Sequence, residues 1–366
     1  MAEKIKIIAF HLPQYHQIPE NDAWWGNGFT EWTNVKKAKP MFDGHLQPKK
    51  PLNDFYYDMT KYETRVWQAN TAQKYGIYGF CYYHYWFHGK LLLEKPLEYL
   101  KEEKEIKLPF CLCWANEPWA RTWDGKGKQI LINQEYGNET DWLNHFSYLE
   151  PFLKDPRYIR IDNKPVIVIY RCSSIKCYDE MIQCWRDAGH KCGIGELYII
   201  DENNSFQSNY ENGSSDAVLD LEPMYTIQYG RSIKEKVIQR IRGQIKAIKY
   251  KNNIHYYNYD EIWRNILSRK ERKYKKKVYL GAFVNWDNTP RKGKKGVVIE
   301  NGTPEKFHQY MQQQIERAKE IGSEYIFINA WNEWAEGTYL EPDEDNSYKY
   351  LESIADLMQV NSTSDT

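Results

Sequence analysis

The feature that most constrains the fold of this chain is a regular alternation of short apolar, β-rich runs with longer helical stretches. This alternation is typical of βα units and of a parallel sheet buried on both faces. Strands are predicted at residues 5–10, 76–82, 109–114, 165–170, 197–201, 217–221, 278–284 and 324–331. Helices are predicted at residues 60–74, 92–103, 139–154, 179–191, 233–249, 259–270, 304–321 and 347–358. Eight strands with helical crossovers predict an α/β fold, a (β/α)8 TIM barrel.

The length of the chain, 366 residues, fits one such barrel with long insertions. No internal repeat or low-complexity linker divides the sequence, and no second domain is evident. We therefore expect a single domain with extended βα loops, a catalytic barrel over residues 1–360 and a disordered tail at 361–366.

Polar and aromatic side chains follow six of the eight predicted strands, at the end where barrel enzymes build their sites. Aromatic residues make up 16% of the chain, and packing between helices and sheet accounts for only about half of them. Hydrogen-bonding groups beside large rings suit a substrate that carries many hydroxyls, so we expect an oligo- or polysaccharide. The predicted substrate-binding residues are His11, Gln14, Tyr15, Tyr83, His84, Trp86, Trp114, Asn116, Glu117, Trp119, Glu222, Trp286, Asp287, Trp331, Asn332 and Trp334.

Two glutamates three residues apart follow the last predicted strand. Cleavage of a glycosidic bond typically needs two carboxyl groups, one that protonates the leaving oxygen and one that assists attack on the sugar carbon. Glu333 and Glu336 lie in a turn rich in Asn, Trp and Gly, which can direct both toward one cleft. The flanking Trp331 and Trp334 are expected to exclude water and to raise the pKa of one carboxyl. Glu333 and Glu336 are therefore the predicted catalytic residues.

Other residues compete for a chemical role and receive a weaker interpretation. Glu117, Glu222 and Asp287 are kept as substrate-binding candidates. His84 and His88 have the spacing of a zinc-peptidase motif, but they stand in an aromatic run with no glutamate between them. The seven cysteines show no C-x2-C pair and are expected to be reduced. No metal or organic cofactor is therefore predicted.

The charge of the chain limits the classes of partner that it is expected to bind. The chain carries 50 basic and 50 acidic side chains, so no overall field would gather nucleic acid, and none is expected as a partner. No apolar run approaches the roughly 20 residues of a membrane span, and the start MAEKIKIIAF lacks signal-peptide features, so we expect a cytoplasmic protein without a transmembrane segment. Residues 231–277 hold sixteen basic and four acidic side chains. They indicate a solvated helix face or, alternatively, a peripheral contact with the inner membrane or a charged polysaccharide.

Several long motifs resemble those of a known family. The segments are AFHLPQYHQIPENDAWWGNGFTEWTNVKKAKP, YGIYGFCYYHYW, LPFCLCWANEPWARTWDG, NWDNTPR and NAWNEWAEGTYLEPD. In this order they are similar to the glycoside hydrolase family 99-like group, which includes the WbsX-type proteins of bacterial O-antigen and capsule biosynthesis. The resemblance runs from the first strand to beyond the last and leaves residues 225–275 poorly matched.

The resemblance implies a (β/α)8 barrel and endo-acting, retaining cleavage of α-mannoside-like linkages. It maps both catalytic acids onto N-E-W-x-E-G, here Glu333 and Glu336. The first takes a proton from the sugar's own 2-hydroxyl, which attacks the anomeric carbon to give a 1,2-anhydro sugar. The second protonates the departing oxygen and later activates water. This route favours α-mannose or α-rhamnose configurations.

Three hypotheses follow. The first is a retaining endo-glycosidase that acts on a bacterial surface polysaccharide or its lipid-linked precursor. The second is a glycosyltransferase of O-antigen, capsule or lipopolysaccharide biosynthesis, because the segment 24–39 is typical of the branch often given that label. The chain lacks the glycine-rich βα turn of the usual nucleotide-sugar folds, which disfavours the transferase. The third is a catalytically silent carbohydrate-binding barrel, which the intact glutamate pair disfavours.

Overall fold

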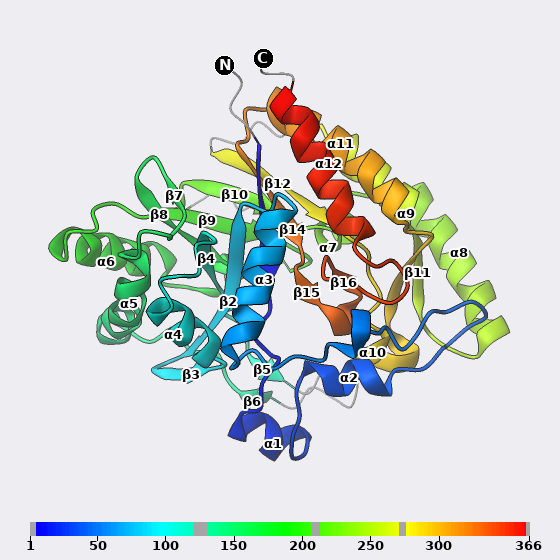
Figure 1. Ribbon diagram of the computed structural model, residues 1–366, viewed down its shortest axis with the longest axis horizontal. Helices are drawn as coiled ribbons and strands as arrows, with labels where there is room; N and C mark the ends of the chain where they lie inside the picture. The colour runs from blue at the N-terminus through cyan, green and yellow to red at the C-terminus, as the bar shows by residue number, and fades with distance from the viewer. Residues whose placement is uncertain (1–4, 121–129, 207–212, 271–275, 364–366) are drawn as a thin grey trace.

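Eight parallel strands close into one barrel in the computed structural model, which describes residues 5–120, 130–206, 213–270 and 276–363. Each strand pairs with the next along the chain, and β1 pairs with both β2 and β14, so the sheet has no free edge (Figure 1). The strands are β1 (Lys6–His11), β2 (Gly79–Phe87), β4 (Phe110–Trp114), β8 (Lys164–Ile169), β9 (Tyr198–Asn203), β10 (Ala217–Asp220), β12 (Lys277–Phe283) and β14 (Tyr325–Asn329). The predicted (β/α)8 TIM barrel is confirmed.

Helices surround the barrel. They are α3 (Tyr62–Lys74), α4 (Lys95–Glu102), α5 (Glu139–Leu153), α6 (Tyr178–Lys191), α9 (Tyr259–Leu267), α11 (Pro304–Glu320) and α12 (Lys349–Thr363). Their starts follow capping chemistry: the side chain of Asn138 accepts a hydrogen bond from the first turn of α5, and Thr303 does the same for α11. Between β9 and β10, the described residues 204–206 and 213–216 contain no helix.

The barrel strands are buried on both faces because helices cover the outside and side chains fill the inside. In β8 (KPVIVI) every residue after the first is buried, as expected for a strand of a parallel barrel. Inside, the ring of Phe10 stacks on Tyr83 at 5.4 Å and lies 6.0 Å from Phe327. The interior is therefore a packed core, and a site can form only at a barrel mouth.

The insertions gather at the C-terminal mouth, low in Figure 1. After β1 come α1 (Pro19–Trp25), α2 (Glu31–Lys37) and η1 (Leu52–Asp54). Later insertions at this mouth are β3 (Lys90–Leu92), β5 (Trp119–Ala120), β6 (Ile130–Ile132), η3 (Cys172–Ser174), α7 (Met224–Tyr229), α8 (Ile233–Tyr250) and β11 (His255–Asn258). The short strand β7 (Arg160–Ile161) instead pairs with the first residues of β8, at the opposite end of the barrel. The last are α10 (Thr289–Lys292), η4 (Gly293–Lys295), β13 (Val297–Glu300), β15 (Asn332–Glu333), η5 (Trp334–Glu336) and β16 (Thr338–Tyr339).

Several predicted boundaries were wrong. The second strand, predicted at 76–82, begins at Gly79 because Gly76 turns with a φ of 82°, and it continues to Phe87 through pairing with β4 and β3. The helix predicted from residue 92 begins at Lys95, since Leu92 belongs to β3 and Leu93 has a φ of 57°. At the chain end α12 continues through residues 361–363, which were predicted to be disordered, and residues 364–366 lie outside the described part.

Candidate active site

The two predicted catalytic glutamates lie on a tight hairpin beyond the last barrel strand. Glu333 ends β15, which pairs with β16, and Glu336 ends the 3-10 turn η5 between them. Gly337 follows with a φ of 64°, and a Cβ there would lie 2.8 Å from the backbone nitrogen of Asp287. The ring of Trp334 stacks on Tyr339 with centroids 3.8 Å apart. The hairpin is thus held from both sides.

Both glutamates line one hollow at the barrel mouth, of about 110 Å³, called here the reaction hollow. Their exposures differ: the side chain of Glu333 is 9% exposed and that of Glu336 is 22% exposed. The other lining residues are Leu12, Tyr83, Tyr85, Ala115, Glu117, Pro118, Trp119, Tyr170, Asn204, Ser205, Leu221, Met224, Trp286, Arg291 and Asn329. They come from β2, from the last residue of β14 and from the loops after the other six barrel strands.

A buried arginine joins the two glutamates. Arg291 of α10 donates from Nη1 to Glu336 at 2.7 Å and from Nη2 to Glu333 at 3.1 Å. Its Nη2 also donates at 2.6 Å to Glu31, which begins α2 and is fully buried. One guanidinium therefore contacts three carboxyl groups, one from the loop after β1 and two from the hairpin after β14, and it fixes the positions of the two carboxyls in the reaction hollow.

The pKa values in this cluster reflect burial first and charge second. Burial raises the pKa of Glu333 well above its ordinary value; Arg291 opposes this, and the charges of Glu336 and Glu31 add to it. Burial likewise raises the pKa of Glu31. Burial lowers the pKa of Arg291, but the charges of the three glutamates outweigh it and hold the group protonated. The cluster thus combines a permanent cation with two carboxyls, those of Glu31 and Glu333, that bind protons more readily than free glutamate.

A second buried carboxyl supports the hairpin from behind. Glu341 accepts hydrogen bonds from Tyr57 at 2.8 Å, Gln68 at 2.8 Å and the indole of Trp334 at 2.6 Å. Burial raises its pKa to about 7, against these three hydrogen bonds. Its contact with Trp334 fixes the ring that separates the two glutamates in sequence.

Four of the sixteen predicted substrate-binding residues line the reaction hollow: Tyr83, Glu117, Trp119 and Trp286. Burial raises the pKa of Glu117, and Arg171, 3.6 Å away, opposes the shift. The buried indole Nε1 of Trp286 has no hydrogen-bond partner in the described structure. It is therefore a donor available to a ligand. Gln14 lines a neighbouring hollow.

His84, Trp86 and Trp114 do not line the reaction hollow, contrary to prediction. Because β2 continues to Phe87, side chains alternate past the predicted end: Tyr83 and Tyr85 line the hollow, whereas His84 and Trp86 point outward. The Nε2 of His84 lies 2.9 Å from that of His145 on α5, and Trp86 stacks on the same imidazole. The indole of Trp114 donates to the carbonyl of Trp86 at 3.3 Å.

Six further predicted residues form the scaffold behind the hollow. Asn332 accepts from the backbone nitrogen of Leu12 at 2.7 Å, and the Tyr15 hydroxyl donates to the Asn332 carbonyl. Asn116 accepts from the backbone of Arg171 at 2.8 Å. The remaining three are fully buried and lie against neighbouring side chains: His11 on Gln68, Trp331 on Phe80, and Trp334 on Glu341.

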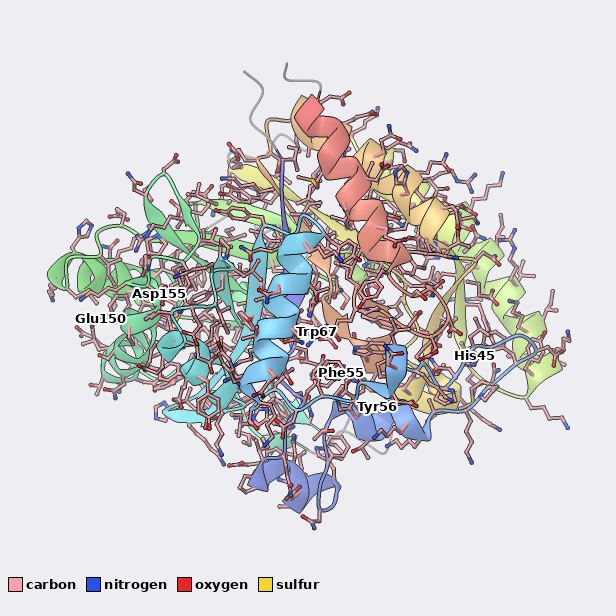
Figure 2. The ribbon with its side chains drawn as sticks, in the orientation of Figure 1. His45, Phe55, Tyr56, Trp67, Glu150 and Asp155 are labelled. Carbon is pink, nitrogen blue, oxygen red and sulfur yellow. The ribbon has the colours of Figure 1, made fainter. Side chains whose placement is uncertain are left out.

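Glu222 and Asp287 are occupied by internal partners. Glu222 accepts from Arg269 at 2.6 Å and is 1% exposed. Asp287 accepts from His45 at 2.7 Å, from Gln47 at 2.7 Å and from Thr289 at 2.6 Å. Figure 2 labels His45, in the long connection after α2 that crosses this side of the molecule. Both acids hold loops together, and neither is free to bind hydroxyls.

The sequence reasoning missed Arg291, Glu31, Tyr85, Tyr170 and Asn204. Arg291 lies within the motif NWDNTPR and Glu31 within the first motif, but neither residue was assigned a role. Nothing in one sequence indicates that residues 260 positions apart form an ion pair. The described residues contain no group of three or more His, Cys, Asp or Glu side chains arranged to hold a metal ion. None of the described helices is both long enough and apolar enough to cross a bilayer.

Residues 7–354 match the sequence family described as "Glycosyltransferase WbsX". The chain belongs to the WbsX family. Two relatives called "Uncharacterized protein WxcX", from Xanthomonas campestris pv. campestris strains B100 and ATCC 33913, are each 35% identical to it over 351 residues. The match covers 95% of this chain and 48% of each relative, so the chain spans about half the length of these curated relatives.

Solved structures show the same fold at low sequence identity. A structure called "Glycoside hydrolase-like protein" matches this WbsX-family chain with a TM-score of 0.62 at 14% identity, over 97% of this chain and 94% of the other. The family 99 endo-α-mannosidase of Bacteroides thetaiotaomicron matches with a TM-score of 0.57 at 14% identity, over 98% of both chains. The family 99-like barrel expected from the motifs is therefore confirmed.

Proposed function

We propose that this chain is a glycoside hydrolase-type enzyme of polysaccharide processing, a retaining endo-glycosidase acting on α-mannoside- or α-rhamnoside-like linkages. The observation that carries the proposal is the pair Glu333 and Glu336, which line one hollow and share one buried guanidinium. The barrel shared with family 99 endo-α-mannosidases supports it. Membership of the WbsX family supports a bacterial surface polysaccharide, or its precursor, as the substrate.

The proposed chemistry uses the substrate's own 2-hydroxyl. The Glu333 carboxylate takes the proton of that hydroxyl, whose oxygen attacks the anomeric carbon. The glycosidic bond breaks, and its oxygen leaves with the proton of Glu336. Water then opens the 1,2-anhydro ring, giving a proton to the Glu336 carboxylate while Glu333 returns its proton to O2. Two displacements retain the anomeric configuration.

The electrostatics of the cluster suit these roles. A raised pKa makes the ionised Glu333 a stronger base than an ordinary carboxylate, which helps it attract the proton of a weakly acidic hydroxyl. Arg291 carries a fixed positive charge against both carboxyls and so keeps a share of Glu333 ionised. Glu336 is the more exposed of the pair, as a group that must reach the leaving oxygen and later a water should be.

The test uses wild type, Glu336→Gln and Glu333→Gln with α-mannan, α-rhamnan and O-antigen oligosaccharides, with and without nucleotide sugars. Products are read by mass spectrometry. We expect shorter oligosaccharides from wild type alone, with no donor required, and retained substrate binding in both variants. A substrate that lacks the 2-hydroxyl should bind and resist cleavage. Unchanged turnover by Glu336→Gln would refute the assignment of the acid.

Transfer to an acceptor glycan is the second candidate, favoured by the family's description as a glycosyltransferase. A retaining barrel glycosidase performs transfer when a sugar hydroxyl replaces water in the second displacement. Products extended only in the presence of a nucleotide or lipid-phosphate donor would establish a transferase. A lengthened product formed from the oligosaccharide alone would indicate transglycosylation by the same glutamate pair.

A further inference from the structure

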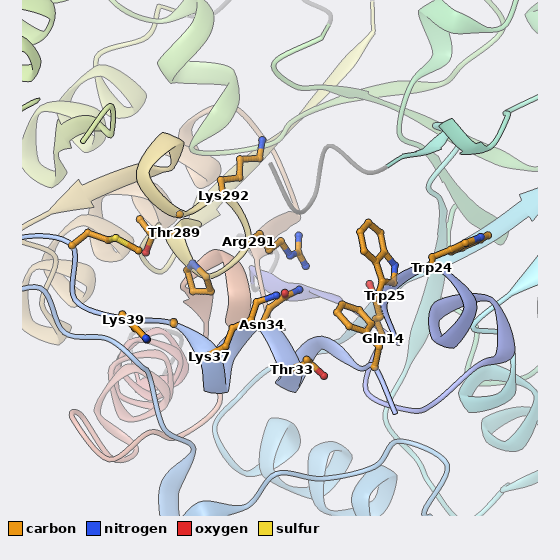
Figure 3. A pocket seen from close by; sticks show the side chains of 15 residues that line it. Gln14, Trp24, Trp25, Thr33, Asn34, Lys37, Lys39, Thr289, Arg291 and Lys292 are labelled. Atoms are coloured by element: carbon orange, nitrogen blue, oxygen red, sulfur yellow. The ribbon is translucent and has the colours of Figure 1, made fainter. Parts of the chain in front are cut away.

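A second, larger hollow of about 610 Å³ lies beside the reaction hollow, and Arg291 lines both. Its walls come from α1, α2 and α10 and from the segments that follow them (Figure 3). We call it the cationic hollow. Its lining residues are Gln14, Trp24, Trp25, Phe29, Thr33, Asn34, Lys37, Ala38, Lys39, Met41, Thr289, Pro290, Arg291, Lys292 and Gly293.

The lining of the cationic hollow carries charge of one sign. Lys37, Lys39 and Lys292 contribute ammonium groups, and none of the lining residues is Asp or Glu. The fourth cation, Arg291, is already matched by Glu31, Glu333 and Glu336. A concave surface with one sign of charge concentrates ligands of the opposite sign. Neither Lys39 nor Lys292 pairs with a carboxyl among the described residues, so these two lysines supply the charge that a ligand of this hollow would meet.

Rings and amides complete a surface suited to a sugar. Trp25 and Phe29 lie with ring centroids 5.7 Å apart, and Trp25 is part of the wall in Figure 3. Gln14 is 1% exposed, and its Oε1 has no hydrogen-bond partner among the described residues. Aromatic planes contact the C–H faces of a sugar, and an unpartnered amide oxygen accepts from a hydroxyl. The hollow thus offers contacts to both a ring and an anion.

We propose that the cationic hollow binds a saccharide unit bearing an anionic group, a carboxylate or a phosphate, next to the linkage cleaved at the glutamate pair. This inference rests on the proposed function, because it names the class of substrate for the same site. The sugar ring lies against Trp25, and its anionic group meets Lys39 and Lys292. The enzyme would thereby select acidic glycans over neutral ones.

The test measures binding to the inactive Glu336→Gln protein by calorimetry, so that it needs no turnover. The ligands are an oligosaccharide containing a uronic acid, the same oligosaccharide with that acid reduced to its neutral sugar, and a phosphorylated counterpart. We expect at least one acidic form to bind about tenfold or more tightly than the neutral one, with affinity falling as salt rises. Comparison of the uronic acid ligand with the phosphorylated ligand shows whether the hollow binds a carboxylate or a phosphate.

Substitutions of lysines test whether the cationic hollow is where the acidic sugar binds. Lys39→Met with Lys292→Met should abolish the preference for the acidic form. Lys36→Met is the matched control, since Lys36 of α2 lies over the ring of Tyr56 at 4.0 Å and does not line the hollow. Equal binding of acidic and neutral forms, or an equal effect of the control, would overturn the proposal. If acidic glycans bind and wild type cleaves none of them, the proposed function fails and the subsite stands.

A second inference rests on a different observation: the apolar face of α8 points into solvent and not toward the protein. Its side chains Ile233, Val237, Ile241, Ile245 and Ile248 are between 51% and 83% exposed. Their spacing of three and four residues places them on one face of the helix. No residue of α8 is buried. An aliphatic stripe of this length in water is a binding surface without its partner.

The opposite face of α8 carries the polar contacts with the barrel. Lys246 pairs with Glu300, Arg242 lies 3.8 Å from Glu261, and Asn265 donates to Glu235 at 2.9 Å. Most helices on a barrel present apolar side chains to the protein and polar ones to water. α8 therefore turns its apolar stripe away from its own fold.

Charge identifies the partner. The helix holds six basic side chains, Lys234, Lys236, Arg240, Arg242, Lys246 and Lys249, and a single acidic one, Glu235, which bonds to Ser232 and Asn265. A second copy of α8 packed on the stripe would bring basic rows against basic rows. An anionic lipid surface accepts the isoleucines among its acyl chains and the lysines at its headgroups. We infer that α8 docks the enzyme on an anionic bilayer.

The experiment is co-sedimentation of the whole protein with vesicles of phosphatidylcholine alone or with 30–40% phosphatidylglycerol as a rough composition. We expect binding only to anionic vesicles, reduced about tenfold or more by Ile241→Ser with Ile245→Ser. Leu46→Ser is the control, because Leu46 is 60% exposed and lies outside α8. Light scattering without vesicles provides the second readout. A dimer lost in the α8 variant, with no vesicle binding, would overturn the inference.

Discussion

Replacing Glu31 with Gln isolates the charge coupling in the proposed catalytic cluster of Arg291, Glu31, Glu333 and Glu336. Glu31 is fully buried and does not line the reaction hollow, so Gln keeps the volume and removes only the charge. Its Oε1 and the Oε2 of Glu333 are 2.6 and 3.1 Å from the same Nη2 of Arg291. The two oxygens therefore lie within about 6 Å of each other.

The size of the effect follows from that separation. At about 6 Å and an effective dielectric constant of about 20, one negative charge raises the free energy of the other by about 3 kcal/mol, equivalent to about 2 pH units. Because burial raises the pKa of Glu31, its carboxyl carries less charge at a given pH than a free glutamate, and the observed change should be about 1 to 2 pH units. Glu31→Gln is expected to lower the pKa of Glu333 by this amount.

Two assays follow the change. The carboxyl carbon of labelled glutamate, observed by NMR, reports the titration of Glu333 without any substrate. The pH profile of cleavage reports its consequence: because Glu333 acts as the ionised base, the acidic limb of the profile should move to lower pH in Glu31→Gln. Glu117→Gln, in the same hollow, is the comparison without a bond to Arg291. An acidic limb that stays in place while the alkaline limb moves would show that Glu333 acts as the acid.

Three further outcomes are expected. Gly337→Ala should lower the free energy of unfolding in urea by about 2–4 kcal/mol, whereas Gly322→Ala, at a φ of 68° with no atom within 4 Å of its Cβ, should cost about 1 kcal/mol. Because burial raises the folded-state pKa of Glu341 to about 7, wild type should lose about 3 kcal/mol of stability relative to Glu341→Gln as pH rises from about 4.5 to 7, and parallel curves would refute this. Trp286→Phe should weaken oligosaccharide binding several-fold, since the indole Nε1 has no internal partner and is the donor that the substitution removes.

The barrel was predictable from sequence because parallel strands buried on both faces give continuous apolar runs. Runs such as VIVI in β8 are short and bounded by turns, and eight of them along one chain leave few alternatives to closure. The ends of the strands were harder to predict, because pairing between strands determines where each one ends. Nothing within the sequence of β2 indicates that β3 extends it to Phe87.

The glutamate pair was predictable as a candidate because its spacing and turn residues are local. The partners that set its chemistry were not, since Arg291 and Glu31 come from other loops and are identified only by the fold. The error over His84 and Trp86 has the same origin. Once the end of β2 moved, the alternation of side chains placed both on the helix-facing side. The substrate-binding role predicted for Glu222 and Asp287 was wrong, because one sequence does not show that Glu222 pairs with Arg269 and Asp287 with His45.

During synthesis, β1 cannot pair with β14 until the ribosome has made the chain between them. Leu12 and Asn332, which bind each other across that closure, are 320 positions apart. At about 5–20 residues per second, a ribosome needs roughly 15 to 65 seconds to make the chain between them. Throughout that interval the first strand has emerged and its last partner does not exist, so one edge of a growing parallel sheet stays unpaired. Because Glu333 and Glu336 follow β14 within a few residues, the stretch of chain that closes the barrel also supplies the proposed catalytic pair.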